Sequence, residues 1–230
     1  MISTETASYL LRICLILVLI SAALLLSTRN LSSLVRTYAA QSLLLALTAL
    51  LLVIIEGKST LILIALITLI SKVITIPWFI RVIQKRIHIQ QDMQFRYLQP
   101  AGALIMSILI ILLVYVCFSQ ILHDLYAESS LFFLGSVIGV SLMLMGLIAI
   151  FSRQLAITKV IGYLSMENGV LLFGLFVTEL PFITEFTIMV DLIILVLLTT
   201  ILTVGIDSTI DAYTSRLKEF HLWSEEGVKP

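Results

Sequence analysis

The chain consists of long runs of hydrophobic residues separated by short polar segments. Seven runs approach the roughly 20 apolar residues that cross a bilayer as a helix. Backbone groups in lipid must be hydrogen-bonded within the segment, and no run shows the alternation of a barrel strand, so each run predicts a helix. The seven predicted membrane helices span residues 9–27, 37–55, 60–80, 101–119, 131–151, 160–178 and 186–206.

Composition supports an all-α integral membrane protein. Hydrophobic residues make up 60% of the chain and charged residues 12%, whereas soluble domains carry about 25% charged residues. The net charge is zero, which argues against nucleic acid as a partner. The first run is too long for a signal-peptide core and no basic residue precedes it. We therefore expect one membrane domain over residues 1–206 and a cytoplasmic tail over 207–230.

The distribution of Lys and Arg predicts the orientation, because cytoplasmic loops carry the excess of positive charge. With the amino terminus outside and seven helices, the carboxyl terminus is cytoplasmic. Only Arg12 and Lys58 then lie on or near the outer side. The basic residues assigned to the cytoplasmic side are Arg29, Arg36, Arg81, Lys85, Arg86, Arg96, Arg153, Lys159, Arg216, Lys218 and Lys229.

Three ionisable residues, Lys72, Glu167 and Asp191, lie inside predicted helices. A charge near the centre of a bilayer costs at least about 2.5–3.5 kcal/mol on insertion scales, so each residue is a functional candidate. A rise of 1.5 Å per residue places Lys72 about 12 Å and Glu167 about 10 Å from the cytoplasmic side. Asp191 falls about 7–8 Å from the outer side. The similar depths of Lys72 and Glu167 make an ion pair between them a hypothesis.

Two interpretations of these charges remain open. Lys72 and Glu167 form either a static pair that locks two helices or a proton relay in which Lys72 changes the proton affinity of Glu167. Asp191 either extends that relay or faces the lipid headgroups. Gln41 and Asn168 are further candidates for the ion path, although such residues also make ordinary hydrogen bonds between helices.

Two local features bear on helix geometry. Pro77 follows Lys72 by five residues, removes a backbone donor and is expected to kink the helix beside the charge. Gly135 and Gly139 form a small-xxx-small pair, which predicts close helix packing.

The sequence contains no nucleophile elbow, phosphate-binding loop, dinucleotide fingerprint or metal-ligand cluster. The two cysteines, Cys14 and Cys117, lie in apolar runs and imply neither a disulfide nor a metal site. We therefore expect no active site and no cofactor in this chain alone.

Three stretches carry a family resemblance: YAAQSLLLAL from Tyr38, ITLISKVITIPW from Ile67 and GYLSMENGVLL from Gly162. They resemble hydrogenase-4 component E, a membrane subunit of group 4 nickel–iron hydrogenases and formate hydrogenlyase complexes. The likeness covers about residues 9–206. The last three predicted helices are also similar to subunit K of NADH–quinone oxidoreductase. In the comparison with subunit K, the position of that family's acidic residue falls at Leu164, one helical turn before Glu167.

The resemblance implies a non-catalytic subunit of a proton- or sodium-translocating redox complex in a prokaryotic inner membrane. Its partners would be antiporter-like and hydrogenase-like subunits, and the redox groups would lie in those partners. A structural scaffold and a small stand-alone transporter are the alternatives. Short loops and the lack of matched broken helices in two repeats argue against the transporter.

Overall fold

The computed structural model describes residues 4–86, 100–121, 130–153, 155–177, 189–194, 196 and 200, and these are almost entirely helical. The elements in chain order are α1 (Thr4–Ser27), α2 (Leu31–Glu56), α3 (Thr60–Thr68), the π-helix η1 (Leu69–Thr75), α4 (Ile76–Arg86), α5 (Pro100–Ile121), α6 (Ser130–Ser152) and α7 (Ala156–Val177). Because α3, η1 and α4 follow one another without a break, they form one span over Thr60–Gln84.

Six of the described helices are long and apolar enough to cross a membrane, which confirms a multi-pass helical protein. They match the first six predicted helices, with several earlier starts. The seventh predicted helix lies mostly outside the described residues, of which 189–194 are helical. The predicted tail over 207–230 lies wholly outside them.

The start of α2 differs most from the prediction, since the helix begins at Leu31 and not at residue 37. The side chain of Asn30 accepts a hydrogen bond from the Ser32 backbone N–H at 3.0 Å and so caps the helix. The prediction placed Arg36 outside the helix because it is charged. At the other end, Gly57 adopts a φ of 71° and its N–H bonds to the carbonyl of Val53, which terminates α2.

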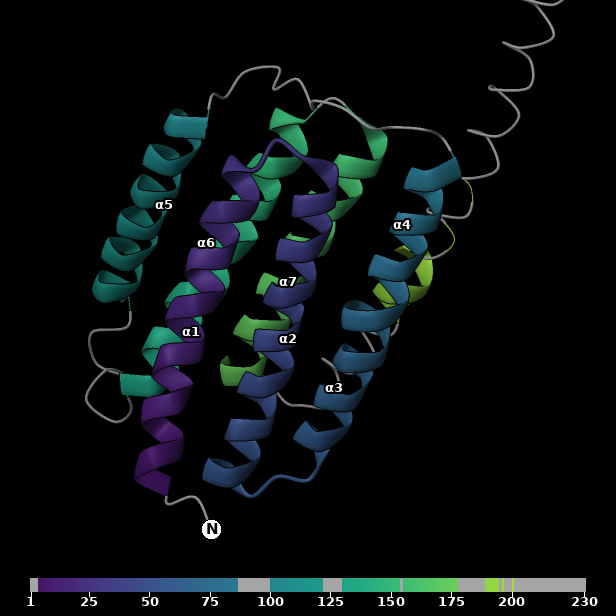
Figure 1. The fold of residues 1–230 in the computed structure, drawn as a ribbon. Helices are drawn as coiled ribbons and strands as arrows, with labels where there is room; N and C mark the ends of the chain where they lie inside the picture. Colours follow the sequence, from purple (N-terminus) through teal and green to yellow (C-terminus); the bar gives the residue numbers. More distant parts are fainter. Residues whose placement is uncertain are drawn as a thin grey trace, which may run out of the picture.

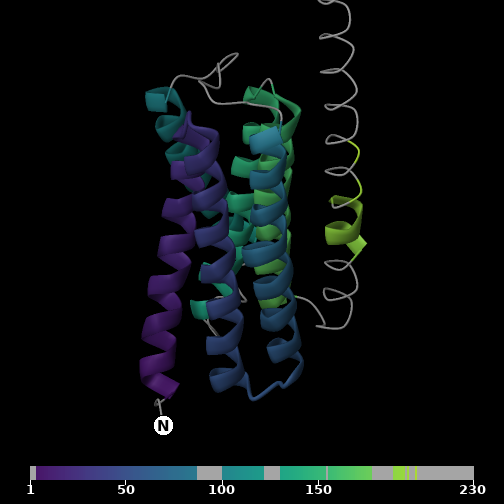
Figure 2. The same ribbon diagram turned by 45° about the vertical axis from the view of Figure 1, so that its right-hand side comes forward.

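The helices form one bundle in which α1 and α2 occupy the centre of the view in Figure 1. Helix α1 packs against α2, α5 and α6, and α2 packs against α3, η1, α4 and α7. Helices α6 and α7 form the most extensive pair, with α5 at one edge of the bundle and α3–η1–α4 at the other (Figures 1 and 2). The central position of α2 brings it against both η1 and α7.

The glycines predicted to mediate packing lie in the α6–α7 interface. A Cβ atom on Gly139 would lie 2.7 Å from the backbone nitrogen of Phe173, and one on Gly135 would overlap the ring of Phe176. Only glycine permits this approach, so the predicted close packing is confirmed. These contacts hold the two helices close together along the last turns of α7.

Basic residues gather at one end of the bundle, which we call the basic end. It contains the α1–α2 turn, the last turns of α4, and the α6–α7 turn, at the top of Figure 1. Lys58, in the turn between α2 and α3, lies at the opposite end. The basic residues at the basic end include Arg29, Arg36, Arg81, Lys85, Arg86, Arg153 and Lys159.

Candidate functional site

Lys72 lies within the π-helix η1, in the middle of the third membrane span. In this segment the backbone N–H of Ile76 bonds to the carbonyl of Ser71, five residues earlier, and the hydroxyl of Thr75 bonds to the carbonyl of Ile70 at 2.9 Å. Pro77 follows directly. The sequence predicted a proline kink here, but not the wider π turn that precedes the proline. Such π segments are rare and occur often at functional sites.

The side chains of Lys72 and Glu167 form a buried ion pair. The Lys72 ammonium donates to Oε1 of Glu167 at 2.7 Å, and the two side chains are 0% and 3% exposed. The pair joins η1 to α7 across 95 residues of sequence. The contact hypothesised from depth is therefore present in the structure.

Asn168 connects this pair to α2. Its Oδ1 accepts a hydrogen bond from the Lys72 ammonium at 3.3 Å. Its Nδ2 donates to Oε1 of Gln41 at 3.3 Å and to Oγ of Ser42 at 3.1 Å. One amide thus joins three helical segments, and all four of these side chains are fully buried. Both neutral candidates from the sequence, Gln41 and Asn168, belong to the network.

Asp191 joins the network through Ser71, the residue before Lys72 in η1. The hydroxyl of Ser71 donates to Oδ2 of Asp191 at 2.6 Å, and Asp191 is 5% exposed. Ser71 is eleven residues from Thr60, the start of its span, so Asp191 lies beside the middle of the third span. The expected depth of about 7–8 Å from the outer side, counted at 1.5 Å per residue from residue 186, is too shallow. The expected depth was too small because it assumed that residue 186 lies at the membrane surface.

The network lies at the centre of the membrane-spanning part of the bundle. Lys72 is twelve residues from each end of the span Thr60–Gln84, and Glu167 is ten residues from each end of Ile157–Val177. At 1.5 Å per residue these positions are about 18 Å and 15 Å from the helix ends. Counted from the helix ends, both residues lie further in than the roughly 10–12 Å predicted, because their helices extend further at the basic end.

Two separate apolar clusters lie on either side of this polar layer. One cluster contains Leu45 of α2, Ala65 of α3 and Leu171 of α7. The other lies toward the basic end and contains Tyr38 of α2 and Ile76 of α4. The polar layer consists of Gln41, Ser42, Thr68, Ser71, Lys72, Glu167, Asn168 and Asp191. A polar layer thus lies between two apolar clusters of the bundle.

Several polar atoms in the layer retain unused bonding capacity. Within the described residues, Oε2 of Glu167, Oδ1 of Asp191, Nε2 of Gln41 and the hydroxyl of Thr68 are buried without a hydrogen-bond partner. Buried polar atoms are normally satisfied by protein or by water. The two carboxylates therefore each keep one oxygen available to accept a proton or to contact a cation.

The sequence analysis missed Ser42 of the layer and Tyr38, which borders it. Ser42 follows Gln41 and contacts Asn168, and Tyr38 lies one turn earlier, fully buried and within electrostatic reach of Glu167 and Asp191. Their spacing at positions i and i+4 puts them on one face of α2, which was the available signal. Within the described ranges, no group of three or more His, Cys, Asp and Glu side chains is placed to hold a metal ion.

Comparison with known proteins adds no relative. No family model matches the chain, and no curated protein or solved structure matches it significantly.

Proposed function

We propose that this chain is a subunit of a proton- or sodium-translocating redox complex, related to group 4 hydrogenases and complex I, and that its polar layer forms part of the ion pathway. The observation that carries the proposal is the Lys72–Glu167 pair at the midpoint of two spans. Charges at that depth are costly, and in membrane proteins they commonly belong to ion routes. The π-helix around Lys72 adds a second feature common at functional sites.

The chemistry follows from the bonding of Glu167. As a carboxylate it attracts the Lys72 ammonium through full charges. When Glu167 takes up a proton it becomes neutral and loses its charge attraction for the Lys72 ammonium, which keeps its hydrogen bond to Asn168. A proton arriving at Glu167 therefore changes the electrostatic field at Asp191, and its release reverses the change. This alternation of Glu167 between its charged and its neutral form is the elementary step of the proposed relay.

The proposed orientation places the basic end in the cytoplasm, the amino terminus outside and the carboxyl terminus inside. By the family resemblance, the membrane is the inner membrane of a prokaryotic cell. The partners are antiporter-like and hydrogenase-like subunits, and the redox groups belong to these partners. In this arrangement the chain contributes side chains to an ion path and binds no cofactor itself.

A structural scaffold is the second candidate function. It is favoured by the close bonding of Lys72, whose ammonium is held by both Glu167 and Asn168. Such a pair can fix helix register without moving charge. The two functions differ in what a neutral, shape-conserving replacement of the pair does to ion movement in an assembled complex.

The partners are tested by affinity purification of the tagged full chain from its native membranes in a mild detergent. We expect antiporter-like and hydrogenase-like subunits to co-purify in fixed ratio. Recovery of the chain alone, or with unrelated proteins, contradicts the proposed complex. Variants with Lys72→Met and Glu167→Leu together separate the candidates: the ion pathway predicts an assembled complex that no longer translocates ions, whereas a scaffold predicts unchanged translocation.

A further inference from the structure

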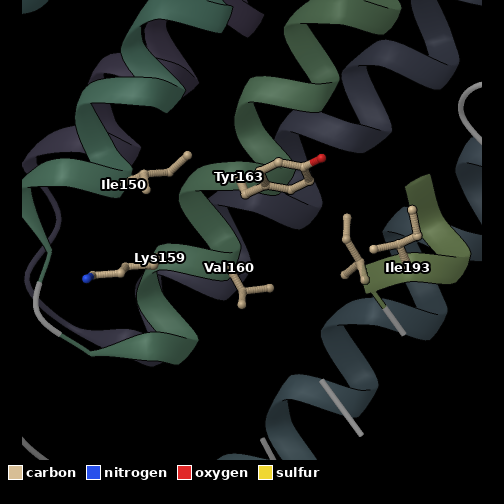
Figure 3. A pocket seen from close by; sticks show the side chains of 6 residues that line it. Ile150, Lys159, Val160, Tyr163 and Ile193 are labelled. Carbon is tan, nitrogen blue, oxygen red and sulfur yellow. The ribbon is translucent and has the colours of Figure 1, made fainter. Parts of the chain in front are cut away.

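A cavity of about 380 Å³ lies on the side of the polar layer that faces the basic end. It is bounded by the end of α6, the first turns of α7 and the helical residues around 193 (Figure 3). Its volume falls within the roughly 300–1,000 Å³ of sites for small molecules and cofactors. The lining residues are Ile150, Lys159, Val160, Tyr163, Ile193 and Ile194.

The lining combines an apolar wall with a cationic edge. The isoleucines and Val160 present only hydrocarbon, while Lys159 contributes its methylene stem and directs its ammonium away from Ile193 (Figure 3). Long basic side chains commonly lie in this way, with the stem on an apolar surface and the charge at the polar boundary. The site therefore suits a ligand with a hydrocarbon chain and an anionic group.

The cavity opens sideways from the bundle, between the basic end and the polar layer. Tyr163 is 38% and Ile193 51% exposed, so the opening faces the surface that lipid covers. Lys159 is three residues after Ala156, the first residue of α7, and Ile150 is two residues before Ser152, the last of α6. Tyr and Lys at such positions commonly anchor helices at the lipid headgroups.

We propose that this groove binds an anionic phospholipid, with one acyl chain against Ile150, Val160 and Ile193 and the phosphate on the Lys159 ammonium. Charge complementarity selects this occupant. The groove lies at the end of the bundle where basic side chains gather, and basic pockets between membrane helices are known to bind anionic headgroups. A helix from a partner protein would cover the groove without supplying an anion to Lys159. The site is separate from the ion pair and does not depend on the proposed function.

The test is native mass spectrometry of the full-length chain, purified in a mild detergent and equilibrated with equal amounts of phosphatidylglycerol and phosphatidylcholine. We expect one retained phosphatidylglycerol per chain. Lys159→Gln removes the charge and lowers retention about fivefold. Ile193→Trp fills the groove from an exposed position, so that the fold is preserved and retention is lost.

Matched controls lie elsewhere on the molecule. Lys58→Gln removes an exposed lysine at the opposite end, and Ile105→Trp enlarges an exposed residue of α5. Both should retain the lipid as the unmodified chain does. Equal retention of phosphatidylcholine, unchanged retention in Lys159→Gln or Ile193→Trp, or absence of any retained lipid would overturn the proposal. The last result is expected if a protein segment covers the groove.

Discussion

Lys72 and Glu167 meet at 2.7 Å, and each lies at the midpoint of its own membrane-spanning helix. The ends of those helices are about 15–18 Å away at 1.5 Å per residue, so neither charge can reach water by extending its side chain. The pair is accordingly held by its own attraction and by Asn168. Its stability and its role in ion movement are separable by mutation.

Neutralising one member of the pair should destabilise the protein more than neutralising both. Lys72→Met or Glu167→Leu alone leaves an uncompensated buried charge, which costs about 3–5 kcal/mol, while replacing both with apolar residues is often neutral or stabilising. Thermal unfolding of the three purified variants in one detergent measures the difference. Single variants as stable as the double variant would contradict a buried, mutually dependent pair.

Asn168→Leu should lower stability by about 1–3 kcal/mol, because it leaves buried donors and acceptors without partners. The groups affected are the Lys72 ammonium, Gln41 and Ser42. Ser107→Ala is the matched control, since Ser107 is also buried but bonds only to the carbonyl of Leu104 in its own helix. Chemical unfolding measures the loss of stability in each variant. Equal losses would show that Asn168 does not link η1, α2 and α7.

Gly139→Ala should loosen the α6–α7 pair. The added Cβ would lie 2.7 Å from the backbone nitrogen of Phe173, which cannot move without shifting α7. Overpacking of this kind costs about 1–3 kcal/mol. Gly102→Ala in α5 is the control, because no atom lies within 4 Å of its new Cβ, and it should leave the midpoint of thermal unfolding unchanged or slightly raised. A similar response of both variants would argue against the close approach.

Arg153→Met should weaken the attachment of the α6–α7 turn to α1. Burial lowers the pKa of Arg153 to about 10, so the guanidinium is still charged at neutral pH, and it donates to the carbonyl of Leu25 at 2.7 Å. Hydrogen bonds of charged groups contribute about 1.5–3 kcal/mol. Arg36→Met replaces an exposed arginine whose side chain donates to the carbonyl of Ser32 within α2, and it should change the free energy of unfolding by less than about 0.5 kcal/mol. Unfolding in detergent compares the two, and equal effects would refute the attachment.

Sequence alone predicted the six membrane helices that the structure describes, and it made contact between Lys72 and Glu167 a hypothesis. Hydropathy identifies membrane spans because a segment in lipid must be apolar and must satisfy its backbone hydrogen bonds internally, as a helix does. Counting residues along a rigid helix then gives relative depth, which placed the two charges at one level. The depth of a residue does not give the rotation of its helix about the helix axis. The hydrogen bond from Asn168 to Ser42 could therefore not be predicted, because it depends on which faces of α2 and α7 meet.

The environment of Asp191 and the π-helix show a second limit. Asp191 was placed near the outer surface because depth was counted from residue 186, whereas its contact with Ser71 fixes it by packing. The π turn at Leu69–Thr75 changes which side chains of one helix face each neighbour. Hydrophobic periodicity is too coarse to register one additional residue in a turn.

The most direct test of the central claim is ion pumping coupled to redox turnover in sealed vesicles that carry the purified complex. Glu167→Gln removes the charge and keeps the shape, and Glu56→Gln, at a carboxylate paired with Lys58 in the α2–α3 turn, is its control. The account predicts that both variants assemble and turn over, and that pumping falls to background in Glu167→Gln alone. Full pumping by an assembled Glu167→Gln complex would contradict the account and leave the chain a scaffold.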